Sequence, residues 1–145
     1  DGDYVRAKYQ LSLHCLQDRF NPNNQAKGFQ KLTELNSNFD VQYKDVIHYL
    51  GFCYEFGIGT TVDQDVTFNY YHNSCHLGYV VAGYALGRCF EEGIGVDVDA
   101  DEARRCFEEA AEKGDIDSKN KLREFEEDNV NFKRTFRNKR KFKWY

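Results

Sequence analysis

The residues best suited to chemistry in this sequence are two histidines and a cysteine in the segment His72-x-x-Cys75-His76. On a helix, residues three and four apart lie on one face, so three potential zinc ligands come together, and a fourth would complete a tetrahedral site. A copy of this segment 36 residues later has glutamate and alanine at these positions, so the cluster does not recur. Cys75 is therefore expected to fill a small core position, and we predict no metal ion and no cofactor.

Other arrangements that could support catalysis are incomplete. His14 and Cys15 are adjacent in the sequence, and neighbouring residues of a helix point about 100° apart, so they do not form a nucleophile and base pair. The segments Gly57-Ile-Gly59 and Gly93-Ile-Gly95 recur as turns and lack the lysine of a phosphate-binding loop. We therefore predict no catalytic residue and no small-molecule substrate, and the protein is not expected to be an enzyme.

The C-terminal segment 131–145 combines basic and aromatic residues and contains no acidic residue. Basic side chains neutralise phosphates and aromatic rings stack on bases, and the same mixture suits an anionic membrane surface. An anionic partner is one hypothesis for this tail, and the other is a final helix or strand that covers the open end of the fold. The candidate tail residues are Lys133, Arg134, Arg137, Lys139, Arg140, Lys141, Lys143 and Trp144.

With 145 residues, 41% of them hydrophobic and 30% charged, the chain has the composition of a single globular domain. No apolar run approaches the roughly 20 residues that a membrane-spanning helix needs, so no transmembrane segment is predicted. The five cysteines lack the spacing of a disulfide framework, which favours an intracellular reducing compartment. The sequence opens on Asp1-Gly2-Asp3, without an initiator methionine or a signal peptide, which indicates a processed or excised fragment.

The elements that must position these residues come from an internal repeat with a period of 36 residues. Residues 43–78 align without a gap with residues 79–114. Such a match between adjacent segments indicates two copies of one structural unit. The identical pairs include Tyr43/Tyr79, Leu50/Leu86, Gly51/Gly87, Cys53/Cys89, Glu55/Glu91, Gly57/Gly93, Ile58/Ile94, Gly59/Gly95 and Asp63/Asp99.

Each copy predicts two helices joined by a turn. Apolar residues three and four apart form one face of the first helix, and Gly51 and Gly87 fall inside this pattern. Glycine in a helix costs about 1 kcal/mol relative to alanine, so each is expected to mark a close approach of two helix backbones. The paired glycines of each turn supply positive φ angles that end the first helix. Asp99, with Glu102 three residues later, predicts a capping box at the start of the second helix.

At these positions the sequence matches a family. The string Ala-x-x-x-Leu-Gly-x-Cys-Phe-Glu-x-Gly-x-Gly-Val-x-x-Asp-x-x-x-Ala-x-x-x-Phe-x-x-Ala-Ala-x-x-Gly, from Ala82 to Gly114, closely resembles the Sel1-like repeat, a relative of the tetratricopeptide repeat. The resemblance implies an all-α fold, a short right-handed α-solenoid of antiparallel helix pairs with about seven helices. The expected organisation is a solenoid over 1–130, with a degenerate repeat 4–42, clear repeats 43–78 and 79–114 and a capping helix 115–130, followed by the tail 131–145.

The resemblance also bears on the cysteines. Some cysteine-rich members of the family staple each helix pair with a disulfide, and Cys75 matches one half of such a pair. Gly83 and Tyr84 stand where the other half would be, so no disulfide is expected.

The resemblance further implies a function, because the family serves mainly as a scaffold for contacts between proteins. The first helices of successive pairs line the concave wall of a solenoid, where a partner peptide or helix docks. We therefore predict a non-enzymatic adaptor that binds another protein or peptide through this wall, with nucleic-acid or membrane-surface binding by the tail as the alternative. The predicted wall residues, which could instead pack on the next repeat, are Lys44, His48, Phe52, Glu55, Tyr84, Arg88 and Glu91.

Overall fold

The computed structural model describes the backbone of residues 2–18, 20–37 and 43–141, and the side chains as far as Asp128. Within these ranges the chain forms seven α-helices and no β-strand, so the predicted all-α fold is confirmed. The helices are α1 (Gly2–Gln17), α2 (Pro22–Asn36), α3 (Lys44–Phe56), α4 (Gln64–His76), α5 (Val80–Glu92), α6 (Ala100–Glu112) and α7 (Ile116–Lys141).

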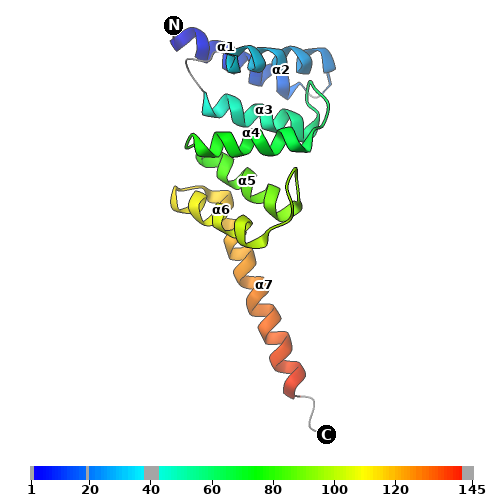
Figure 1. The fold of residues 1–145 in the computed structure, drawn as a ribbon, viewed down its shortest axis with the longest axis vertical. Coiled ribbons are helices and arrows are strands. Elements are labelled where there is room, and N and C mark those ends of the chain that lie inside the picture. The colour runs from blue at the N-terminus through cyan, green and yellow to red at the C-terminus, as the bar shows by residue number, and fades with distance from the viewer. Residues whose placement is uncertain (1, 19, 38–42, 142–145) are drawn as a thin grey trace.

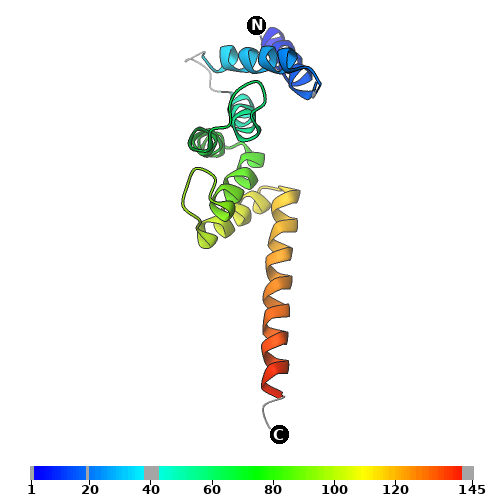
Figure 2. The ribbon, with the colours of Figure 1, turned by 90° about the vertical axis from the view of Figure 1, so that its right-hand side faces the viewer.

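The helices form antiparallel pairs that are stacked along one axis, α1 with α2, α3 with α4 and α5 with α6 (Figure 1). Each pair packs on the next through consecutive helices, and α7 packs on α6. The predicted short right-handed α-solenoid is therefore confirmed. Over most of its length α7 runs away from the stack, as the view turned by 90° also shows (Figure 2).

In each of the two clear repeats, an aspartate fixes the start of the second helix. The Asp63 carboxylate accepts a hydrogen bond from the Val66 amide, and the Asp99 carboxylate accepts from the amides of Asp101 and Glu102. The predicted capping box is only half formed, because the Asp99 amide donates to the Phe90 carbonyl and is not free for Glu102. The Glu102 carboxylate instead accepts from Arg105.

The turn between the helices of a repeat uses its two glycines for different purposes. Gly57 and Gly93 end their helices with φ angles of 67° and 76°, the left-handed conformation that glycine adopts without strain. Gly59 and Gly95 also have positive φ, and each lies against a backbone carbonyl of the preceding pair, that of Gln25 in α2 or Gln64 in α4. A β-carbon at either position would collide with that carbonyl. The second glycine therefore allows one repeat to dock on the one before it.

Gly51 and Gly87 accept an aromatic ring, and the prediction that they mark the approach of two helix backbones is wrong in this detail. A β-carbon on Gly51 would lie 2.9 Å from the ring of Tyr71, and one on Gly87 would lie 2.5 Å from the ring of Phe107. Both rings are fully buried and belong to the second helix of the same pair. The glycine leaves the space that a large side chain of the partner helix fills, and this packing offsets its low helix propensity.

The N-terminal pair also packs around a glycine, but this glycine lies on the second helix and allows a close approach to the main chain of the first. Gly28 of α2 faces α1, where a β-carbon would lie 2.8 Å from the Ser12 carbonyl oxygen. Pro22 occupies the first turn of α2, and the side chain of Asn21 caps this helix. The segment predicted as a degenerate repeat is thus a helix pair of the same general kind, although its small residue lies on the opposite partner.

Cys53 and Cys89 occupy equivalent positions in the core, as predicted for small buried side chains. Both are fully buried, and burial raises the pKa of each thiol to about 12. All five cysteines are free thiols, so the structure contains no disulfide among them. Cys53 packs with Leu32 and Leu50 in a cluster that joins α1, α2 and α3 into one core.

Candidate partner-binding surface

The first helices present a connected group of aromatic rings, which we call the aromatic strip and define as Tyr9, Tyr49, Phe52 and Phe56. The ring of Tyr49 in α3 lies 5.9 Å from that of Tyr9 in α1 and 6.5 Å from that of Phe52, and Phe52 lies 4.8 Å from Phe56. Phe52 and Phe56 remain 38% and 52% exposed. The strip is therefore a partly open apolar surface on rigid helices.

Of the four residues of the strip, the predicted wall contains only Phe52. Phe56 follows Phe52 by four residues and so shares its helix face, which is a signal the sequence offers. Tyr9 lies in the N-terminal helix, where the repeat pattern is too weak to place a residue beside α3.

Glu55 and Arg88 form a joint between the two repeats. The Glu55 carboxylate, with its side chain 7% exposed, accepts hydrogen bonds from the Arg88 guanidinium at 2.9 Å and from the Tyr71 hydroxyl at 2.6 Å. Arg88 also contacts Glu92 at 3.0 Å, and this contact, with the charge of Glu55, raises the pKa of the guanidinium. Burial, with the hydrogen bond to Glu55, raises the pKa of Tyr71. Arg88 therefore stays charged and connects α5 to α3.

The equivalent residue of the next repeat makes a similar joint. Glu91 is paired with Lys121 of α7 at 3.0 Å, so an acid near the end of a first helix contacts a cation of the following first helix in both cases. Lys44, at the start of α3, donates to the Gly78 carbonyl at 3.3 Å. Glu55, Arg88 and Glu91 thus make contacts between successive helix pairs, whereas the contact of Lys44 lies within its own repeat. Whether these residues also bind a partner stays a prediction.

His48 is surrounded by aromatic rings, among them that of Tyr71, which also takes part in the joint of Glu55 and Arg88. Its ring centroid is 5.2 Å from those of Tyr71 and Tyr79 and 5.6 Å from that of Tyr49. The buried Nδ1 atom has no hydrogen-bond partner among the described residues, and burial lowers the pKa of His48 to about 4. The imidazole is therefore neutral near pH 7. Tyr84, at the equivalent position, contacts Phe107 with 5.6 Å between ring centroids.

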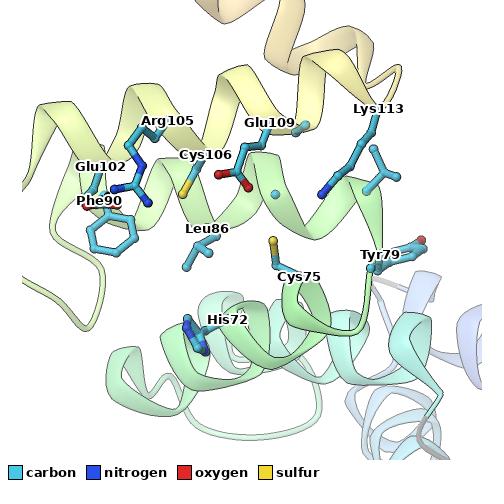
Figure 3. A pocket seen from close by; sticks show the side chains of 14 residues that line it. His72, Cys75, Tyr79, Leu86, Phe90, Glu102, Arg105, Cys106, Glu109 and Lys113 are labelled. Atoms are coloured by element: carbon cyan, nitrogen blue, oxygen red, sulfur yellow. Dashed lines mark hydrogen bonds and ion pairs between the residues drawn. The ribbon is translucent and has the colours of Figure 1, made fainter.

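A pocket of about 210 Å³ lies between α4, α5 and α6. Cys75 and Cys106 point into it from α4 and α6, with His72 and Glu109 near its rim (Figure 3). Burial raises the pKa of Cys75 and raises that of Cys106 to about 11, so both remain protonated thiols near pH 7. Among the described residues, no group of three or more histidines, cysteines or acids is placed to hold a metal ion.

The predicted tail residues lie at the limit of the described chain. The backbone of residues 131–141 is the continuation of α7, so the helix passes without a break through the expected boundary at residue 130. Lys143 and Trp144 lie outside the described residues, and so do the side chains of Lys133, Arg134, Arg137, Lys139, Arg140 and Lys141. An anionic partner for this segment therefore stays a prediction. No helix in the described ranges has the length and apolar character to cross a membrane.

Comparison with known protein families gives matches in the part of the chain that carries the joint and most of the strip. The model of the Sel1 repeat matches residues 45–79 and again residues 81–115. The chain contains two Sel1 repeats. Repeats of this family form helical solenoids that commonly serve as scaffolds for protein interactions and are generally not catalytic.

Solved structures of Sel1-type proteins share this fold. A Sel1 repeat protein from Oxalobacter formigenes is 28% identical, with a TM-score of 0.64, over 83% of this chain and 88% of the other. A protective antigen of uropathogenic Escherichia coli is 25% identical, with a TM-score of 0.71, over 83% of this chain and 25% of its own. Cysteine-rich protein B of Helicobacter pylori is 25% identical, with a TM-score of 0.58, over 81% and 87% of the two chains. A search of curated proteins finds no match.

Proposed function

We propose that this Sel1-repeat protein is a non-enzymatic adaptor that binds an apolar segment of a partner protein on the aromatic strip. The observation that carries the proposal is the exposure of Phe52 and Phe56 side by side on α3. Exposed aromatic side chains on a rigid support are typical anchors of protein interfaces, because they bury a large area at little cost in conformational entropy.

The surroundings of the strip support this role. The joint of Glu55 and Arg88 holds α3 against α5, so the strip is preorganised and little ordering is needed on binding. Arg88 and Glu92, whose side chains are 26% and 49% exposed, place an ion pair one repeat further along the wall. A partner helix or extended peptide with apolar residues at its centre and polar residues at its edges matches this arrangement.

The test uses binding peptides selected from a random display library with the intact chain. Their affinity is then measured by calorimetry for the wild type and for the double variant Phe52→Ala with Phe56→Ala. Loss of two central aromatic anchors weakens binding by roughly tenfold or more. The control is Phe20→Ala, because Phe20 is 97% exposed and belongs to the turn between α1 and α2 and not to the strip. Peptides that bind the double variant as tightly as the wild type would show that the strip is not the binding surface.

A further inference from the structure

The projecting part of α7 is a helix without a partner in the described structure. The helix of 26 residues is about 39 Å long, and only its beginning packs on α6 (Figures 1 and 2). We call residues 116–128 the acidic half and residues 129–141 the basic half. In both views no other described helix lies beside the basic half. A helical segment of this length is marginal in water unless it packs on something.

The charges of the basic half strengthen this requirement. It contains six basic residues and no acidic residue. Lys133, Arg137 and Lys141 follow one another at intervals of four, which places like charges in neighbouring turns and destabilises an isolated helix. The acidic half has five acidic and three basic residues, and four of the acids lie within residues 124–128. One helix thus carries both a basic surface and the acidic surface that would complement it.

Four apolar residues of α7, together with two polar ones, follow the spacing of a helix-pairing seam. Ser118, Leu122, Phe125, Asn129, Phe132 and Phe136 are separated alternately by four and three residues. Ser118 is buried and Leu122 and Phe125 are half-buried, and Phe125 lies 5.9 Å from Phe107 of α6 between ring centroids. The line that begins on the solenoid therefore continues along the projecting helix at the positions of Asn129, Phe132 and Phe136.

We infer that α7 pairs with α7 of a second copy of this chain in an antiparallel arrangement centred near Asn129. This arrangement places the position of Phe125 beside that of Phe132 of the other copy, and Leu122 beside Phe136. It also sets residues 124–128 of each copy, which we call the acidic turn, against the basic half of the other. A parallel pair would instead place six basic residues beside six, which opposes association. The pairing is independent of the aromatic strip and joins two adaptors into one bivalent molecule.

The first experiment measures association of the full-length chain by sedimentation equilibrium at low and moderate salt. We expect a dimer whose dissociation constant increases with salt, because complementary charges contribute to it. Two reversed variants test the charges, one with the acidic turn made basic and one with the basic half made acidic. Each is expected to dissociate at least tenfold more readily than the wild type, and an equimolar mixture is expected to restore association. The changes are Glu124→Lys, Glu126→Lys and Glu127→Lys in one variant, and Lys133→Glu, Arg134→Glu and Arg137→Glu in the other.

The control and the direction of pairing complete the test. Reversal of two exposed acids of α6, Glu108→Lys with Glu112→Lys, is expected to leave association unchanged, while circular dichroism checks that every variant is folded. A zero-length carbodiimide crosslinker applied to a mixture of ¹⁴N and ¹⁵N chains is expected to join the acidic turn of one copy to Lys133 of the other. A monomeric wild type overturns the inference. If that monomer binds RNA or anionic vesicles, the basic half serves an anionic partner and not a second copy of the chain.

Discussion

Replacing Arg88 with methionine tests whether the joint between the repeats stabilises the fold. Methionine keeps most of the apolar stem of arginine and removes the guanidinium, so the Glu55 carboxylate loses its cationic partner. The Tyr71 hydroxyl would remain as its hydrogen-bond donor. The change therefore leaves a charge in a site where only 7% of the Glu55 side chain is exposed.

The size of the effect follows from this partial burial. Loss of one partner of a fully buried ion pair costs about 3–5 kcal/mol, whereas an exposed pair contributes about 0–1 kcal/mol. Glu55 is close to the first limit, but Arg88 is 26% exposed and water can reach its side of the pair. We therefore expect Arg88→Met to lower the free energy of unfolding by about 2–3 kcal/mol.

The assay is urea unfolding of the wild type, Arg88→Met, Glu55→Gln and the double variant. If the two residues form one joint, the double variant should be more stable than the sum of the single changes predicts, by about 1 kcal/mol or more. The matched control is Arg105→Met, because Arg105 pairs with Glu102 at the same 2.9 Å but is 65% exposed. Equal losses at Arg88 and Arg105 would refute the reasoning, since burial would then make no difference.

Two further predictions concern packing and protonation at the same repeats. Gly87→Ala is expected to destabilise the fold by about 1–2 kcal/mol in thermal unfolding despite its better helix propensity, because the new methyl group meets the buried ring of Phe107; an unchanged or higher melting temperature would contradict this. His48 has a pKa of 6.5 in the unfolded chain and of about 4 in the folded chain, so the unfolded state binds a proton first as the pH falls. This residue therefore lowers the free energy of unfolding as the pH falls from about 6.5 to about 4. The free energy of unfolding of His48→Gln is therefore expected to depend less on pH between these values, and parallel pH profiles for the variant and the wild type would count against it.

The repeated part of the fold is predictable from the sequence because its determinants are local. Glycine in a turn, aspartate before a helix and apolar residues three and four apart each specify a structure within a few residues. The positions of Gly57, Asp63 and Cys53, and their counterparts 36 residues later, could therefore be assigned correctly. The capping box was predicted only in part, since the Phe90 carbonyl that competes for the Asp99 amide lies nine residues away in the other helix.

The candidate surface is harder to predict because it depends on the rotation between successive pairs. The sequence of one helix shows which residues share a face, but it does not show which of them the next repeat covers. Glu55 and Arg88 belong to the predicted wall, yet they form an ion pair with each other across the boundary between repeats. Phe52 and Phe56 remain open beside them. The sequence places the wall residues on one face of each first helix, but it does not divide that face into joint and exposed surface.

The contact of Gly59 and Gly95 with the carbonyls of the preceding pair bears on how such a chain can change in evolution. This docking site is built from main-chain atoms and the absence of a side chain, so it does not require matched substitutions in two repeats. After a unit of 36 residues is duplicated or deleted, the second glycine of each turn can still pack against a main-chain carbonyl of the preceding pair. Length can therefore change in whole units while side chains on the wall diverge, which separates the inheritance of the architecture from that of its specificity.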